Sequence, residues 1–277
     1  YTIAQADATF EPADATILKD ADIGVTVLAP NGNGSGLTNL PEDTTKQNTL
    51  VSGTNIKTVS GTSILGTGDI AIASGGFSSM QVFTVSGTWI RPVGITKIEV
   101  IVIGAGGGGG ASISGVSAGS GGGAGGTSIK IIDVSAIASE TVTIGAGGVG
   151  GNASVTTGGT GGNSSFGIQA VGNGGVGGTY FYTGEAGIGG TATSGDINIS
   201  GGGGTAGIVG GSGSAAANGQ GGSSYLGGSG ATKYNNNSNG DNGSAYGSGG
   251  CGGVSDTATV YDGGTGADGI VIIREYK

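Results

Sequence analysis

The 277-residue sequence contains no histidine and only one cysteine, Cys251. Without histidine, the chain lacks the side chain that most often acts as a general base or binds a metal ion. A single cysteine can form neither an internal disulfide nor a cysteine-cluster metal site. Basic residues are also scarce, nine against 18 acidic ones, and the net charge is −9. We therefore expect no metal, no cofactor and no nucleic-acid partner, because phosphates are bound by clustered Lys and Arg.

Bulky apolar side chains are sparse as well. Hydrophobic residues make up 35% of the chain and aromatic residues 5%, which is little material for an ordinary core of this size. No apolar run approaches the roughly 18 residues that cross a bilayer, so we expect no membrane insertion. Stability must instead come from many cooperative backbone hydrogen bonds, close packing of glycines or association between chains, because glycine loses more freedom on folding than any other residue.

What the chain has in abundance is glycine, with 70 residues, most of them between positions 104 and 269. Many recur at every third position, which is the repeat of the left-handed polyproline II helix. Apolar segments and aromatic clusters interrupt the runs and argue against a flexible linker. Four prolines and a broken register argue against collagen. We therefore predict an ordered bundle of polyglycine II helices. One run of the triplet spacing is Gly201, Gly204, Gly207, Gly210 and Gly213.

Short segments rich in Val, Ile and Thr predict β-strands. The strongest spans residues 97–103; it is apolar on both faces near its end, which favours a central place in a sheet. These segments lie before the glycine region, in its first half and at its end. The simplest architecture is a small β-sandwich base whose first and last strands bracket the polyglycine II bundle. Further strands are expected at 82–90 (with an internal turn), 128–134, 141–144, 166–171 and 270–273.

The residues upstream suggest other roles. Residues 1–45 are interpreted as a connector or shaft end. Residues 46–76 form a β-rich fibrous shaft repeat and hinge, because Val-Ser-Gly-Thr at 51–54 recurs at 59–62 and Ser-Gly-Gly ends the segment. One chain cannot bury such narrow strands alone, so side-by-side or threefold association is expected, with hairpins in a monomer as the alternative. Residues 77–277 form the third part, a glycine-rich tip domain.

Several motifs, taken in order, resemble the glycine-rich C-terminal domain of bacteriophage tail fibres. Phe-Thr-Val-Ser-Gly-Thr-Trp-Ile-Arg-Pro-Val-Gly at 83–94 leads into an apolar strand and a glycine run at 98–109. The other matching segments are 141–148, 161–167 and 266–273, the last reading Gly-Ala-Asp-Gly-Ile-Val-Ile-Ile. The resemblance covers about residues 80–277. Together with the upstream segments, it implies a mainly β fold, a fibrous shaft followed by a β-sandwich base that carries polyglycine II helices.

The same resemblance implies a function. Related adhesins form the receptor-binding tip at the distal end of the virion's tail fibre, where loops contact a bacterial outer-membrane protein or a lipopolysaccharide or other glycan. Because shaft-like segment and tip share one chain, we expect a homotrimer together with other tail fibre subunits. Exposed aromatics are favoured contact residues, although some must instead pack between glycine helices. The candidates are Tyr180, Phe181, Tyr182, Tyr225, Leu226, Tyr234, Asn235, Asn236, Tyr246 and Tyr261, whereas Phe166 is assigned to the core, and Trp89 and Tyr276 to the core or to contacts in the base.

Two other functions remain open. A structural glycine-rich protein, ice-binding or part of a cell wall, would expose a flat, regular face of small residues, whereas this chain often breaks its triplets. A polysaccharide hydrolase would need paired carboxylates about 5 to 9 Å apart. None of the available acids lies in a recognisable motif, so we expect a non-catalytic protein. Those acids are Glu185, Asp196, Asp241, Asp256 and Asp262.

Overall fold

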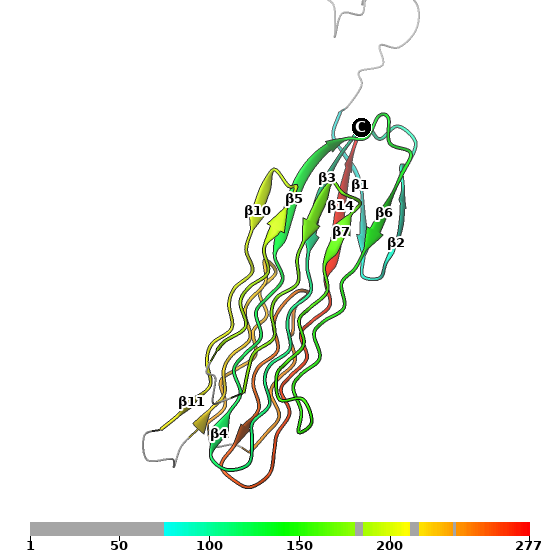
Figure 1. Ribbon diagram of the computed structural model, residues 1–277. Coiled ribbons are helices and arrows are strands. Elements are labelled where there is room, and N and C mark those ends of the chain that lie inside the picture. The colour runs from blue at the N-terminus through cyan, green and yellow to red at the C-terminus, as the bar shows by residue number, and fades with distance from the viewer. Residues whose placement is uncertain (1–74, 181–184, 211–215, 235–236) are drawn as a thin grey trace, which may run out of the picture. The chain divides into compact units, whose positions relative to one another are not determined.

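The computed structural model describes residues 75–277 apart from 181–184, 211–215 and 235–236. The connector at 1–45 and nearly all of the shaft and hinge at 46–76 lie outside these residues, so what is said of them stays a prediction. Residues Ser74–Lys277 form one compact unit (Figure 1). Its described residues contain strands but no helix, and hence none long and apolar enough to span a bilayer. The expectation of a mainly β fold is confirmed for this part of the chain.

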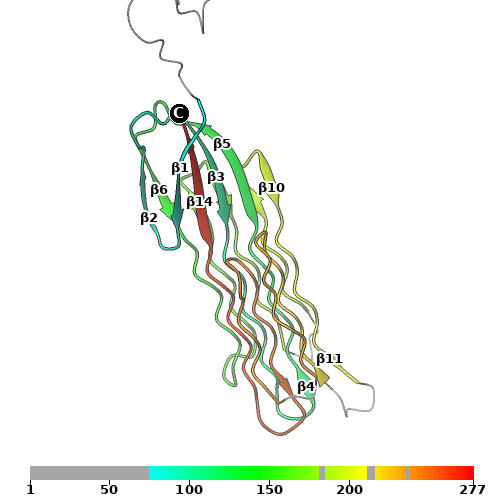
Figure 2. The same ribbon diagram turned by 180° about the vertical axis from the view of Figure 1, so that it is seen from behind.

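Two five-stranded antiparallel sheets lie at the end of the unit that holds the C-terminus (Figures 1 and 2). The first and last strands of the unit pair with each other at one edge. In order across the first sheet, the strands are β1 (Phe77–Phe83), β14 (Ile270–Tyr276), β3 (Lys97–Ile103), β5 (Thr127–Asp133) and β10 (Ile197–Ile199). Across the second they are β2 (Gly87–Ile90), β6 (Ser139–Thr143), β7 (Ser164–Phe166), β8 (Ala170–Gly172) and β9 (Ala192–Thr193).

The inner faces of these two sheets form the main hydrophobic core. Val100 of β3 and Val271 of β14 pack in one cluster with Trp89, Val142 and Phe166 of the second sheet, and all five are fully buried. The rings of Trp89 and Phe166 meet edge to face, with centroids 5.7 Å apart. The core positions predicted for these two aromatics are therefore confirmed, and the sheets form the expected sandwich.

Most of the predicted strands match the structure, and 97–103 matches β3 without a shift. One prediction is wrong: residues 166–171 are not a single strand, because the chain turns between β7, which ends at Phe166, and β8, which begins at Ala170. Gly167 adopts a left-handed conformation with φ +50°, and Gln169 N donates to the Phe166 carbonyl at 3.0 Å. Glycine reaches this conformation without steric cost, so the chain reverses where the apolar pattern alone suggests continuity.

Beyond the sheets, extended glycine-rich segments run side by side to the opposite end of the unit (Figures 1 and 2). Segment 104–111 follows β3 and shows the bonding pattern most clearly. Every third amide donates to the same neighbouring segment. The three sets of amides therefore donate to three different segments, 118–126, 156–163 and 260–269. The bonds to the first of these run from Gly104, Gly107 and Gly110 to the carbonyls of Gly126, Gly123 and Ser120.

The carbonyls of segment 104–111 accept from three further segments, 146–151, 173–179 and 247–255. Segment 118–126 has an equivalent shell: it donates to 247–255, 173–179 and 200–207, and accepts from 104–111, 185–191 and 218–223. These two central segments are thus enclosed by other backbone on all sides. A Cβ on Gly106 would collide with the carbonyl of Ser248, and one on Gly109 with that of Cys251. Side chains are excluded there because backbones touch.

Candidate functional site

The end of the glycine segments opposite the sheets, called the far end below, is built from the turns that connect them. Two short antiparallel pairs lie there, as the labels β4 and β11 in Figure 1 show. Ala118, Ala216 and Val254 pack together at these pairs and form a small apolar cluster. This cluster fixes the ends of the segments. The pairs are β4 (Ser117–Ala118) with β13 (Val254–Ser255), and β11 (Ile208–Val209) with β12 (Ala216–Ala217).

Side-chain hydrogen bonds hold the far-end turns in place. Ser112 N donates to the Tyr261 carbonyl at 2.9 Å, and Tyr261 N donates to Ser112 Oγ at 2.8 Å. Asn237 and Asp256 are also joined by two hydrogen bonds: Asp256 N donates to Asn237 Oδ1 at 2.8 Å, and Asn237 Nδ2 donates to the Asp256 carboxylate. The turns are therefore cross-linked to one another, which favours a rigid surface at this end.

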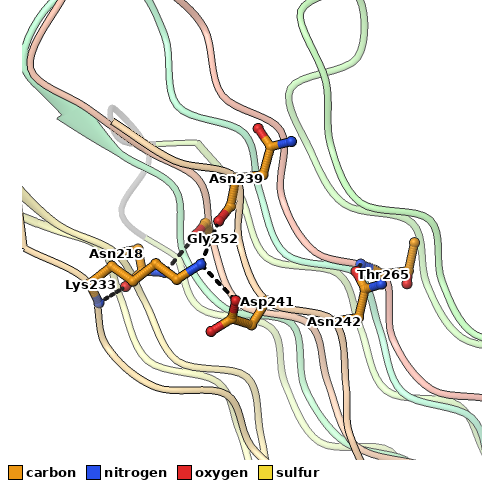
Figure 3. Close-up of polar contacts among 7 residues, drawn as sticks. All are labelled: Asn218, Lys233, Asn239, Asp241, Asn242, Gly252 and Thr265. Atoms are coloured by element: carbon orange, nitrogen blue, oxygen red, sulfur yellow. Dashed lines mark hydrogen bonds and ion pairs between the residues drawn. The ribbon is translucent and has the colours of Figure 1, made fainter. Parts of the chain in front are cut away.

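Lys233 is the only basic residue in the sequence between positions 144 and 269. Figure 3 shows its ammonium held by Asp241 and Asn239. Lys233 Nζ lies 2.6 Å from Asp241 Oδ1 and 2.9 Å from the Asn239 carbonyl. The Lys233 amide donates to Asn218 Oδ1 at 2.6 Å, and Asn218 Nδ2 donates to the buried Gly252 carbonyl at 2.8 Å. Because the cation is already paired, this cluster fastens the chain rather than offering an anion site.

Two asparagines extend the network at the edge of the bundle, and one of them, Asn242, was not among the candidates from the sequence. Thr265 N donates to Asn242 Oδ1 at 2.9 Å (Figure 3), and Asp262 N donates to Asn239 Oδ1 at the same distance. The glycine after each asparagine donates back to the carbonyl of the same partner, at 2.8 Å in both cases. The signal was the repeat Asn-Gly-Asp-Asn-Gly, which spaces the two amides by three residues.

Three of the aromatic candidates lie at the far end. Tyr234 forms a β-bridge with Ala217 of β12, and its side chain is 73% exposed. Tyr261 is bonded to Ser112, as described above, and is half-buried. Tyr180 directly follows Thr179, whose carbonyl accepts from Ser120 close to β4. Four further candidates, Phe181, Tyr182, Asn235 and Asn236, lie outside the described residues.

Tyr225, Leu226 and Tyr246 lie elsewhere, at the sheet end of the bundle. Ser224 Oγ donates to the Tyr246 carbonyl at 2.7 Å, so the two turns adjoin. A Cβ on Gly247, the next residue, would meet Ile103 and the Gly104 carbonyl, where β3 ends. The aromatic candidates among the described residues are therefore divided between the two ends of the bundle. Segment 218–223 runs back toward the sheets before its turn, which places the turn at the near end.

Three of the acids considered above as hydrolytic groups make hydrogen bonds or ion pairs within the fold. Asp241 pairs with Lys233, Asp256 with Asn237, and Asp196 Oδ2 accepts from the Ile131 amide at 2.9 Å. Among the described residues, no three His, Cys, Asp or Glu side chains gather as metal ligands would. These carboxylates act as hydrogen-bond acceptors that position turns and strand edges.

Cys251 lies inside the bundle and is fully buried. Burial raises the pKa of its thiol, with a smaller contribution from the Asp241 carboxylate. Its sulfur lies close to Gly230, where a Cβ would approach Sγ to 2.6 Å. Because the thiolate is the reactive form, a buried thiol with a raised pKa is poorly nucleophilic at neutral pH.

Comparison with known families identifies one match. A family model described as a glycine-rich domain aligns with residues 78–276. The aligned region starts in β1 and ends in β14, so it includes both sheets and all the glycine segments. No curated protein shows significant similarity to the chain. The match confirms the expectation of a glycine-rich domain.

Proposed function

The chain belongs to the glycine-rich domain family, and we propose that it is the non-catalytic tip of a bacteriophage tail fibre. In this proposal it lies at the distal end of the fibre on the virion and binds a receptor on the bacterial surface. The receptor is an outer-membrane protein or a glycan such as lipopolysaccharide. The tip forms a homotrimeric fibre end with other tail fibre subunits. The resemblance of the motifs at 83–94 and 266–273 to tail-fibre tips supports this assignment.

The proposal includes the backbone conformation of the glycine segments, which we infer to be polyglycine II helices. A helix with three residues per turn directs successive amides to three sides, so residues three apart meet the same neighbour. The bonds made by Gly104, Gly107 and Gly110 follow this rule. A pleated strand repeats every two residues and bonds to neighbours on two sides only. Six neighbouring segments, three bonded through amides and three through carbonyls, fit the helix and not the strand.

The observation that carries the functional proposal is the position of Tyr234. Its side chain is 73% exposed, yet its backbone is tied to β12 at the end of a bundle whose interior is enclosed backbone. Loops on a rigid scaffold are common places for recognition residues. An aromatic ring held in this way offers a large contact area at small entropic cost on binding. Tyr180 and Tyr261 lie at the same end and extend the proposed contact surface.

The test uses the full chain with a fluorescent protein at its N-terminus, incubated with a panel of Gram-negative bacteria. At least one strain should bind it saturably, and the double variant Tyr234→Ala with Tyr261→Ala should bind that strain at least about tenfold more weakly. Tyr225→Ala is the matched control, since this tyrosine is 50% exposed but lies at the sheet end. A panel without any binding strain, or equal binding by the double variant, would refute the proposal.

A second candidate function rests on the outer face of the bundle. Segments 156–163, 173–179 and 185–191 are neighbours, joined by bonds such as Gly161 N to Gly175 O and Val176 N to Ile188 O, both 2.9 Å. In each, a residue larger than alanine recurs at every third position and is at least partly exposed, which gives a regular face of the kind an ice-binding protein would use. Its side chains are mixed, so we rank it second. Thermal hysteresis of a millimolar solution would favour this candidate over the adhesin.

A further inference from the structure

We propose a second binding site, at the sheet end of the bundle, for one neutral sugar ring. A cavity of about 350 Å³ lies there, far from Tyr234 and the other far-end residues. Small-molecule sites range from about 300 to 1,000 Å³, so this volume suits a single small ring rather than an extended chain. The cavity is lined by Leu226, Ser244, Ala245, Tyr246, Ala267 and Asp268.

Hydrogen bonds hold the first turn of the cavity wall in place. Ser224 and Gly227 exchange two backbone bonds, 3.1 and 2.9 Å long. Gly227 has φ +90°, a conformation that a side chain would strain. The Ser224 hydroxyl donates to the Tyr246 carbonyl at 2.7 Å. This bond joins the turn that carries Leu226 to the turn that carries Tyr246. Leu226 and Tyr246 are therefore held next to each other before any ligand arrives, and preorganised walls lower the entropic cost of binding.

The second turn fixes the polar side of the cavity. Gly247 N donates to the Asp268 carbonyl at 2.8 Å, and Asp268 Oδ1 accepts from the Gly147 amide at 2.7 Å. Within the described part of the chain, Asp268 Oδ2 has no hydrogen-bond partner. One oxygen of this carboxylate thus positions the side chain, and the other remains able to accept a hydrogen bond from a ligand.

The two sides of the cavity match the two kinds of surface on a sugar. Tyr246 and Leu226 are 41% and 44% exposed, and they supply the apolar wall on which the C–H face of a pyranose would rest. Asp268 Oδ2 and the Ser244 hydroxyl supply an acceptor and a donor-acceptor for the ring hydroxyls. A few polar groups on an apolar wall is the usual composition of a small-ligand site.

Charge and ring number restrict the ligand further. Among the described residues, no Lys or Arg lines the cavity, and Asp268 is acidic, so a phosphate or an acidic sugar would be repelled. Organic cations are best held by several aromatic faces, but only one aromatic ring of the part that the structure describes lines this cavity. An uncharged sugar is the chemistry that remains. This inference does not rest on the far-end receptor surface, and either proposal can fail alone.

The test is ligand-observed NMR on the full chain with glucose, galactose, mannose and N-acetylglucosamine, and with choline chloride and inorganic phosphate as separate arms. We expect at least one neutral sugar to bind with a millimolar dissociation constant. Tyr246→Ala should weaken it about tenfold or more. Asp268→Asn keeps the acceptor for the Gly147 amide but loses the charge, and should weaken binding several-fold.

Tyr225→Ala is the control, because Tyr225 lies on the same turn but does not line the cavity. It should leave sugar affinity unchanged. Resistance of Cys251 to thiol reagents shows that each variant keeps its bundle folded. Binding of choline or phosphate alone, no binding of any neutral sugar, or full affinity in folded Tyr246→Ala would overturn the proposal. Failure of the bacterial binding assay would leave this result unaffected.

Discussion

Gly106→Ala is the sharpest test of the enclosed glycine segments. Gly106 lies in segment 104–111, and an added Cβ would overlap the carbonyl group of Ser248 in a neighbouring segment. That group is backbone and cannot rotate away as a side chain could. Relief requires the two segments to move apart, although both are bonded to other segments as well. The substitution should therefore disturb several segments at once.

The expected size follows from two contributions. Overpacking a well-packed interior costs about 1–3 kcal/mol. Gly106 itself makes two backbone bonds, donating to Ala267 O at 2.9 Å and accepting from Gly148 N at 2.8 Å. Loss of each costs about 0.5–1.5 kcal/mol net. We therefore expect the free energy of unfolding to fall by about 2–6 kcal/mol, which is a large part of the roughly 5–15 kcal/mol typical of a domain.

Gly203→Ala is the matched control for this variant. Gly203 is exposed, and a Cβ there meets only the Gly187 carbonyl at 3.6 Å, an ordinary contact. We expect the free energy of unfolding to stay the same or to rise by up to about 1 kcal/mol, because alanine restricts the unfolded chain more than glycine does. Urea unfolding followed by the fluorescence of Trp89, the only tryptophan, measures both variants. Thiol labelling of Cys251 provides a second probe inside the bundle. Stabilities of the two variants within 1 kcal/mol of each other would refute enclosure of Gly106.

Three further predictions concern single side chains. Glu275 is 1% exposed and accepts from Trp89 Nε1 and two other side-chain donors, so Glu275→Ala should cost about 2–4 kcal/mol in urea unfolding, against less than about 1 for Glu99→Ala, whose ion-pair partner Arg274 has a side chain that is 46% exposed. Burial raises the pKa of Cys251, so stability should be constant below the thiol's ordinary value of 9.0 and fall above it by at most about 1.4 kcal/mol per pH unit; Cys251→Ala should remove that dependence. Asn242→Ala should cost about 0.5–1.5 kcal/mol, whereas Asn242→Asp, which keeps the acceptor for the Thr265 amide, should cost less when measured in the same way.

The sandwich base could be predicted because its strands carry local signals. Alternation of apolar and polar residues, or an unbroken apolar run, identifies a strand without knowledge of its partners. Residues 97–103 are an example, and they are central in their sheet, as their two apolar faces require. Pairing is a property of distant residues, yet the position of 270–273 at the end of the chain was enough to suggest a strand that brackets the bundle.

The burial of Glu275 could not be predicted from such local signals. On β14, Val271, Ile273 and Glu275 alternate and are all buried, so the period-two pattern does point the carboxylate inward. A charged residue at the end of a strand is usually assigned to solvent, because burial of an unpaired charge is costly. The cost is offset here by donors from β1 and β2, including the Trp89 indole at 2.8 Å. Those donors are almost 200 residues away in sequence, and no local pattern reveals them.

The aromatic turns were harder still, because residue type does not say at which end of the bundle a turn lies. Tyr225 and Tyr234 are nine residues apart and similarly polar in context, but they occupy opposite ends. The end at which a turn lies depends on how many times the chain has reversed its direction since the last strand of the sheets. Segment 200–207 leaves the sheets, segment 218–223 returns to them, and the chain then leaves again before Tyr234. Counting the reversals along the chain would have separated the two tyrosines.

The glycine triplets themselves carry information on depth in the bundle. The two central segments, 104–111 and 118–126, contain only glycine, alanine and serine. Segments at the outer face, such as 173–179, place a larger residue at every third position, because one of their three sides has no neighbouring backbone. Segment 247–255 is intermediate: the Cys251 side chain occupies the side that faces Gly230. The number of positions in the three-residue repeat that carry side chains thus indicates how many sides of a segment have no neighbouring backbone. This relation follows from contact between backbones and requires no hydrophobic core in the bundle.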